Sequence, residues 1–102
     1  MSVWMVTGGA GMLAQEVRAR LAAAGIGTAV LGRAELDIAD PASVAAAMEA
    51  HRPAVVVNCA AWTAVDDAET HEEAALAVNG TGPRLLAESC RRAGAVLLHV
   101  ST

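Results

Sequence analysis

The stretch VWMVTGGAGMLA, residues 3–14, decides the fold of this 102-residue chain. Val3 to Val6 is an apolar run of strand length, and it ends at Thr7-Gly8-Gly9 as a strand ends at a turn. From Gly11 onward apolar residues recur at helical intervals, at Leu13, Val17, Leu21 and Ala24. Glycines 25 and 27 then stop the helix. A strand, a glycine turn and a helix in direct succession indicate the start of a parallel α/β unit.

The rest of the chain continues this alternation. The other expected strands are residues 28–31, 35–38, 55–57 and 95–100. The other expected helices are 43–50, 66–78 and 84–93, and residues 79–83 interrupt the chain between the last two. Asp40-Pro41 indicates the start of the first of these helices, because aspartate is a common N-cap and proline is common at the first helical position. The strand runs are continuously apolar, so they favour a Rossmann-like, doubly wound parallel sheet of five strands, truncated after the fifth, with helices on both faces. We expect one domain over residues 1–102.

Composition and charge exclude several classes of function. Hydrophobic residues make up 55% of the chain, which is enough for a core, and the net charge of -4 argues against nucleic acid or an anionic membrane as partner. No apolar stretch is long enough to span a membrane, and the N-terminus does not resemble a signal peptide. Cys59 and Cys90 lack the spacing of metal ligands, so we expect two buried, reduced thiols in a cytoplasmic protein.

The glycine segment has the pattern GxxGxxA at Gly8, Gly11 and Ala14. A phosphate needs backbone N–H donors at close range, and the N-terminus of a helix adds a favourable dipole. We expect Gly8 to make the turn and Gly11 to admit a pyrophosphate, with Met12 and Leu13 beside it. A purely structural glycine turn is the alternative. The position inside a strand–turn–helix unit favours a nicotinamide dinucleotide.

The residue after the second strand bears on which dinucleotide would bind. Enzymes of this fold that select NAD usually place an acid there to hold the ribose hydroxyls, whereas this chain has Gly32-Arg33. A guanidinium matches a 2′-phosphate bidentately, so we favour NADPH over NADH. The alternative is that Arg33 is a solvated loop residue.

Four segments together carry a resemblance to a known family. They are TGGAGML at residues 7–13, LDIAD at 36–40, VNCAAWTAVDDAE at 57–69 and HVST at 99–102. The chain resembles the dTDP-4-dehydrorhamnose reductases, which are extended short-chain dehydrogenases, or a close antibiotic-sugar 4-ketoreductase. The resemblance covers essentially the whole chain, and the segment at 57–69 is its most specific part.

The resemblance implies roles along the cofactor. Asp37 would accept a hydrogen bond from the adenine amino group, although an ordinary acid at a helix entry is the alternative, and Ile38 would pack on the adenine ring. Ala60 and Ala61 would let the ribose and phosphates lie against the backbone. Thr63 would bond near the nicotinamide ribose.

The resemblance also implies a catalytic residue. Thr102 would hydrogen-bond the C4 carbonyl of a dTDP-4-dehydro-6-deoxy sugar, together with the Tyr and Lys of a downstream Tyr-x-x-x-Lys motif; Ser101 is the second candidate. Asn79 would correspond to a buried asparagine that ties its helix to the sheet, a structural role more than a catalytic one.

The chain departs from the family in containing no tyrosine and no lysine. We therefore expect the N-terminal part of a longer enzyme, inactive by itself. One alternative is a sugar-nucleotide epimerase or dehydratase, although epimerases more commonly place a histidine after the strand that Asn58 ends. The other is a non-catalytic regulatory subunit that keeps the dinucleotide fold.

Metal and subunit partners receive less support. Some relatives are reported to use Mg²⁺ at a dimer contact, but the acidic stretch 66–73 is better interpreted as a solvated helix face, so we predict no metal site. A homodimer of the full-length protein stays open.

Overall fold

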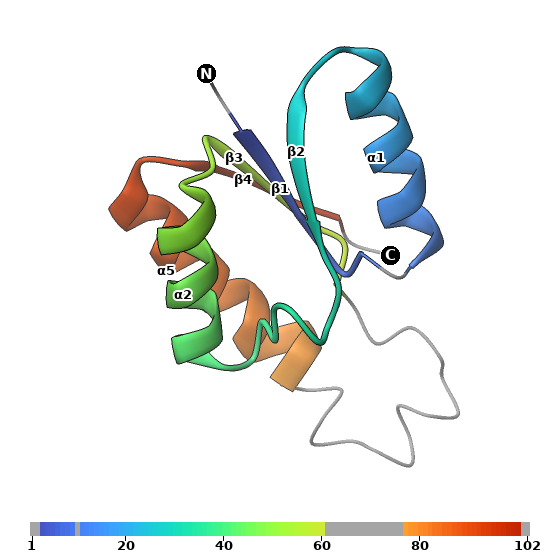
Figure 1. Cartoon of the computed structure of the whole chain (residues 1–102). Coiled ribbons are helices and arrows are strands. Elements are labelled where there is room, and N and C mark those ends of the chain that lie inside the picture. Colours follow the sequence, from blue (N-terminus) through green and yellow to red (C-terminus); the bar gives the residue numbers. More distant parts are fainter. Residues whose placement is uncertain (1–2, 10, 61–76, 101–102) are drawn as a thin grey trace, which may run out of the picture.

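A computed structural model describes residues 3–9, 11–60 and 77–100, and these form a parallel sheet with helices on both faces (Figure 1). The four strands of this part lie in the order β2-β1-β3-β4. In chain order the described elements are β1 (Val3–Thr7), α1 (Met12–Ala23), β2 (Gly27–Leu31), α2 (Pro41–His51), β3 (Val55–Asn58), the π-helical turn η1 (Ala77–Thr81), α5 (Gly82–Ala93) and β4 (Val96–His99).

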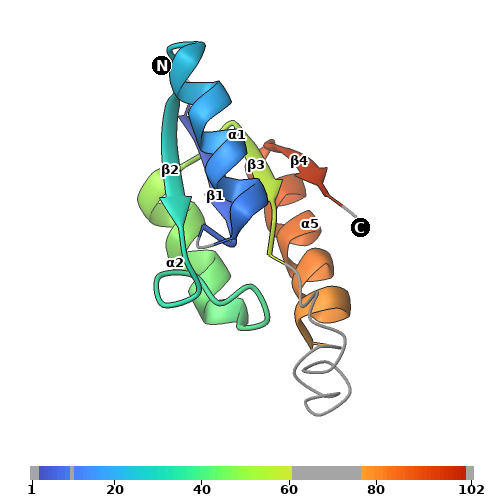
Figure 2. The same cartoon turned by 90° about the vertical axis from the view of Figure 1, so that its right-hand side faces the viewer.

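The helices form two layers, one on each face of the sheet. Helix α1 covers one face, and α2 and α5 lie side by side on the other (Figures 1 and 2). Neighbouring residues of a strand point to opposite faces, so Met5 packs in the core under α2 and α5 while Val6 packs under α1. The apolar strand runs are explained by this burial on both faces.

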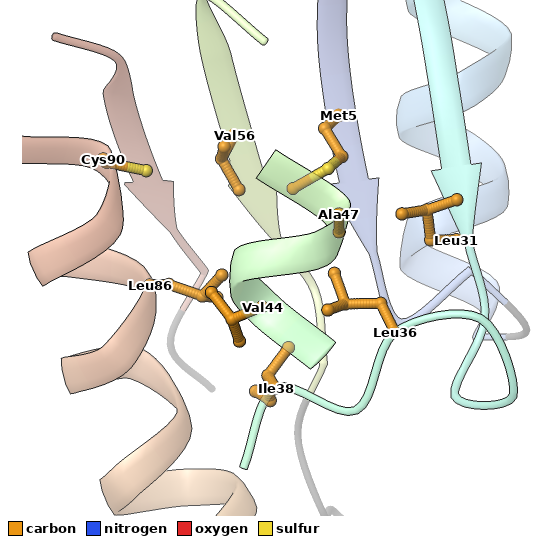
Figure 3. Close-up of a cluster of buried hydrophobic side chains, with 9 residues drawn as sticks. All are labelled: Met5, Leu31, Leu36, Ile38, Val44, Ala47, Val56, Leu86 and Cys90. Atoms are coloured by element: carbon orange, nitrogen blue, oxygen red, sulfur yellow. The ribbon is translucent and has the colours of Figure 1, made fainter. Parts of the chain in front are cut away.

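The larger core cluster fills the space between the sheet and the pair α2 and α5 (Figure 3). Its strand residues include Met5 and Val56, which are fully buried. The helices contribute Val44 from α2 and Leu86 from α5, at 1% and 0% exposure. Burying such side chains supplies most of the stabilisation of a small α/β unit, at about 25 cal/mol per Å² of apolar area.

The ends of the helices follow the local signals in the sequence. Asp40 caps α2, because its Oδ1 accepts a hydrogen bond from Ala42 N at 3.0 Å, and proline occupies the start of this helix. Gly25 and Gly94 follow α1 and α5 with φ values of +73° and +71°. These glycines adopt the left-handed conformation that ends helices, so these three expectations are confirmed.

The expected strand at residues 35–38 was wrong, and so was the total of five strands. The segment forms turns, in which the N–H groups of Glu35 and Leu36 both donate to Gly32 O, at 3.0 and 2.9 Å. Leu36 and Ile38 are nevertheless buried, at 3% and 2% exposure. Alternate burial produced the strand-like pattern, but the main chain of this segment forms local hydrogen bonds. It therefore adds no strand beside β2, which is one of the two edge strands of the described sheet.

The expected interruption at 79–83 is also different in the structure. A π-helical turn over 77–81 runs directly into α5, which begins at Gly82. Asn79 lies in this turn and is exposed, so the expectation of a buried asparagine was wrong. The expected helix at 66–78 lies outside the described residues except for its last two positions, and these belong to the π-helical turn.

The described helices are all too short or too polar to cross a bilayer.

Candidate functional site: a glycine loop at the carboxyl edge of the sheet

The candidate site lies where β1, β2 and β3 end. The strands are parallel and in register, with Thr7 opposite Leu31 on one side and opposite Asn58 on the other. Their carboxyl ends therefore meet at one edge, and the segments that follow them lie together. Ligands of open α/β sheets bind at this edge.

Gly8 brings the first of these segments against the third. Its φ is +69°, a conformation that side chains rarely adopt, and a Cβ atom here would lie 2.7 Å from Ala60 N and 2.8 Å from Ala60 Cα. The turn after β1 thus contacts the main chain after β3. This contact joins two of the predicted cofactor-binding residues.

Gly9 brings the same loop against β2, which sequence reasoning missed because the position is variable in the GxxGxxA pattern. A Cβ atom at Gly9 would lie 2.8 Å from Val30 Cγ1 and 3.1 Å from the carbonyl carbon of Leu31. Gly9 N also donates to Leu31 O at 2.9 Å, and Gln15 Nε2 donates to Gly9 O. The adjacent glycines 8 and 9 are the signal that could have indicated two close approaches.

The N-terminus of α1 carries no side-chain cap. Gly11 is its N-cap residue, with φ -78°, and a Cβ atom there would meet only Gly8 O, at 3.4 Å. The first N–H groups of a helix have no partner within the helix, so they are available to an anion. Met12 and Leu13 lie in this first turn, with 92% and 41% of their surface exposed. Helix α2 differs, because Asp40 already places a carboxylate at its N-terminus.

The connection from β2 to α2 carries three further predicted residues. Arg33 and Asp37 are exposed. Asp37 Oδ1 accepts a hydrogen bond from Ala39 N at 3.0 Å, and Asp37 N donates to Ser43 Oγ at 3.0 Å. The side chain of Ile38 instead lies in the core, 2% exposed, so a contact with an adenine ring stays a prediction.

Three of the predicted site residues lie outside the described residues, namely Ala61, Thr63 and Thr102. The acidic stretch 66–73 does as well. Within residues 3–9, 11–60 and 77–100, no group of three or more His, Cys, Asp or Glu side chains could hold a metal ion.

A row of polar side chains crosses the strand ends and was missed from the sequence. Thr7 Oγ1 donates to Asn58 Oδ1 at 2.6 Å, and Asn58 Nδ2 lies 3.0 Å from His99 Nδ1. Asn58 Oδ1 also accepts from Ala60 N at 3.1 Å. Thr7 and Asn58 are fully buried. The signal was available, because each of these residues closes an apolar strand run.

Both cysteines have free thiols, as expected. Cys90 is a buried residue of α5, whereas Cys59, which follows Asn58, is only half-buried, so the expectation of a buried thiol is confirmed for Cys90 and was wrong for Cys59. Burial raises the pKa of each thiol above its ordinary value of 9.0, because the thiolate would lose its hydration. Neither environment activates a nucleophile at neutral pH.

An open hollow of about 400 Å³ lies beside the glycine loop. Its lining includes Gly9 from the loop, Gln15 and Arg18 from α1, and Gly32 and Glu35 from the segment after β2. The hollow thus extends from the glycine loop to the residues around Arg33.

Two solved structures resemble this fold over nearly all of the chain. One is dTDP-4-dehydrorhamnose reductase from Bacillus anthracis in complex with NADP, with a TM-score of 0.87, 28% identity and coverage of 95% of this chain and 35% of that one. The other is UDP-glucose 4-epimerase from Thermus thermophilus in complex with NAD, with a TM-score of 0.83, 28% identity and coverage of 91% and 35%. The backbone alone therefore does not separate reductases from epimerases.

Sequence similarity separates them better. The chain is 58% identical over 99 residues to the dTDP-4-dehydrorhamnose reductase of Streptomyces griseus, covering 97% of this chain and 33% of that protein. It thus spans about a third of the length of this curated relative. A family profile described as the RmlD substrate binding domain matches residues 1–102. The chain therefore belongs to the RmlD substrate binding domain family.

Proposed function

We propose that this chain is the dinucleotide-binding part of an NADPH-dependent reductase that acts on the C4 ketone of a dTDP-4-dehydro-6-deoxy sugar, yielding dTDP-L-rhamnose or a related deoxy sugar. One observation carries the proposal. The N-terminus of α1, which has no side-chain cap, opens beside a glycine loop that is in contact with Ala60, so the N–H groups of a helix start and bare main chain lie at one edge. The high identity to a reductase favours this activity over the epimerase.

The residues of this chain would bind and orient, and the bound cofactor would supply the hydride. The N–H groups at Met12 and Leu13 would hold the pyrophosphate, Ala60 and Ala61 would face the ribose, and Thr63 would bond near the nicotinamide. Thr102 would donate a hydrogen bond to the C4 carbonyl oxygen and stabilise the developing alkoxide. The chain has no tyrosine or lysine to complete the proton donor, so we assign it binding and not turnover.

The preference for NADPH rests on charge. Arg33 follows β2 on the exposed surface, and Arg18 lines the hollow that reaches from the loop to Gly32. Two guanidinium groups near the expected ribose of the adenosine would favour a 2′-phosphate. The two free thiols fit a reducing compartment, so we place the protein in the cytoplasm.

Gly11→Asp tests the binding site without removing the fold. The position has an ordinary φ and room for a Cβ atom, and aspartate is a good N-cap, so the melting temperature should stay the same or rise slightly. The new carboxylate would occupy the anion site and repel the pyrophosphate. We expect the dissociation constant of NADPH, measured by fluorescence titration, to rise at least about tenfold. Equal affinity in Gly11→Asp and the unchanged chain would contradict the proposal.

Arg33→Ala tests the choice of dinucleotide. Titration of the unchanged chain should show tighter binding of NADPH than of NADH, and the variant should lose most of that difference because the 2′-phosphate loses its guanidinium partner. We expect the ratio of the two dissociation constants to fall about tenfold. Arg52→Ala, on the opposite end of the sheet, is the matched control and should leave the ratio unchanged. An unaltered ratio in Arg33→Ala would refute the preference.

A further inference from the structure

A row of polar side chains, the buried Thr7 and Asn58 and the exposed His99, joins the carboxyl ends of three neighbouring strands. The three residues are the last of β1, β3 and β4, and they are direct partners in the strand register. Their side chains therefore lie on the same face of the sheet, the face covered by α2 and α5 (Figure 1). The polar groups of Thr7 and Asn58 are fully buried, so they need hydrogen-bond partners within the protein.

The hydrogen bonds fix the orientation of the Asn58 amide. Ala60 N can only donate, so the Asn58 atom 3.1 Å from it is the oxygen. The Thr7 hydroxyl donates to the same oxygen at 2.6 Å. The amide nitrogen is consequently the group that faces His99. No buried side-chain polar atom in the described part of the chain lacks a partner.

This orientation dictates the state of His99. Asn58 Nδ2 carries only hydrogens, so the ring atom 3.0 Å away, His99 Nδ1, must be an acceptor. A neutral imidazole with a lone pair on Nδ1 carries its hydrogen on Nε2. Asn58 therefore selects one tautomer and ties the end of β4 to the end of β3.

We propose that Asn58 is a positioning residue that, through His99, holds the end of β4 in register with the Cys59–Ala60 segment of the dinucleotide site. Val100 N donates to Asn58 O at 3.2 Å, so side chain and main chain of Asn58 both hold the same point of β4. The segment that leads to Thr102 is thereby connected to the segment that contacts Gly8. The binding part of this inference rests on the proposed function, and the tautomer part does not.

Nuclear magnetic resonance of the histidine rings tests the hydrogen bond from Asn58 to His99 directly. In the unchanged chain at pH 8, His99 should be in the Nε2–H form, while His51, for which no ring hydrogen bond is described, serves as the internal reference. Asn58→Asp removes the amide donor and places an acceptor opposite Nδ1. We expect the Nδ1 position of His99 to become protonated in this variant. An Nδ1–H ring in the unchanged chain, or the same tautomer in both proteins, would overturn the proposal.

Two substitutions of His99 separate positioning from simple packing. His99→Asn places an amide oxygen near the position of Nδ1 and keeps an acceptor for Asn58, whereas His99→Leu leaves the Asn58 amide without one. We expect NADPH affinity to fall about tenfold in His99→Leu and to recover in His99→Asn. Equal affinity loss in the two variants would refute positioning. Absence of NADPH binding to the unchanged chain would count against the proposed function. The tautomer measurement would still show whether Asn58 donates to His99.

Discussion

At Gly8 the backbone has φ +69°, and a Cβ atom would lie 2.7 Å from Ala60 N and 2.8 Å from the carbonyl carbon of Cys59. Two separate physical requirements thus apply to one residue. The left-handed conformation costs a non-glycine residue about 1–2 kcal/mol. The close approach costs more, because both neighbours are main-chain atoms of a strand end and cannot rotate away.

Gly8→Ala and Gly25→Ala form a matched pair that separates these costs. Gly25 has nearly the same φ, +73°, but a Cβ atom there meets nothing within 4 Å. We expect Gly25→Ala to lower the free energy of unfolding by about 1 kcal/mol and Gly8→Ala by about 3 kcal/mol or more. Urea denaturation followed by circular dichroism measures both.

The difference between the two variants reports the contact of the glycine loop with Ala60. Equal destabilisation would show that the loop moves away from β3 at no cost, so that Gly8 does not join two parts of the proposed dinucleotide site. Gly8→Ala should also weaken NADPH binding, whereas Gly25→Ala should not, because Gly25 lies at the opposite end of α1.

Between elements, the start of α5 packs directly on the loop that follows β2. A Cβ atom at Gly82 would lie 2.5 Å from Ile38 Cδ1 and 2.6 Å from Ile38 Cγ1. Ile38 also contacts the core that α2 and α5 share. The start of α5 therefore packs against Ile38 in the segment predicted to bind adenine. The absence of a side chain at Gly82 allows this close contact.

Gly82→Ala should destabilise the protein although alanine is the better helix former. Helix propensity alone would raise the free energy of unfolding by about 0.5–1 kcal/mol, but the clash with Ile38 should lower it by about 1–3 kcal/mol. A double-mutant cycle with Ile38→Ala, measured by thermal and urea unfolding, checks the cause.

Because Ile38→Ala removes both of the contacted atoms, the combined variant should be more stable than the sum of the single effects predicts. Additive effects would mean that the clash is not with Ile38.

For the whole molecule, the buried thiol of Cys90 and the half-buried thiol of Cys59 predict how stability changes with pH. Burial raises the pKa of Cys59 and Cys90 in the folded state above the ordinary value of 9.0 that applies to the unfolded chain. Above pH 9.0 the unfolded chain loses thiol protons that the folded chain keeps. The stabilisation from these groups is complete below that pH and is lost as pH rises toward the folded-state pKa.

Cys90→Ala should flatten this alkaline loss. The variant lacks one of the two shifted groups, so its free energy of unfolding should fall less steeply between neutral pH and pH 10. At neutral pH it should be less stable by about 1 kcal/mol, because a small buried side chain is truncated. Urea unfolding under reducing conditions at several pH values measures both effects. An unchanged slope above pH 9.0 would show that Cys90 ionises equally in the two states.

The sequence by itself determined the class of fold and most element boundaries. Continuous apolar runs indicated buried parallel strands, and Asp40, Gly25 and Gly94 marked helix ends, since capping and positive φ are properties of single residues. The glycine pattern also indicated the turn at Gly8. Such signals are local, so they can be interpreted without knowing the partners.

The tertiary structure alone decided which residues meet. Residues 35–38 alternate like a strand, yet their hydrogen bonds are local and their apolar side chains fill the core. The need for glycine at Gly9 and Gly82, and the tie from Asn58 to His99, depend on segments distant in sequence. The amino-acid sequence gives the composition and the spacing of apolar residues. Close approaches and hydrogen-bond partners arise only when separate strands and helices pack against each other.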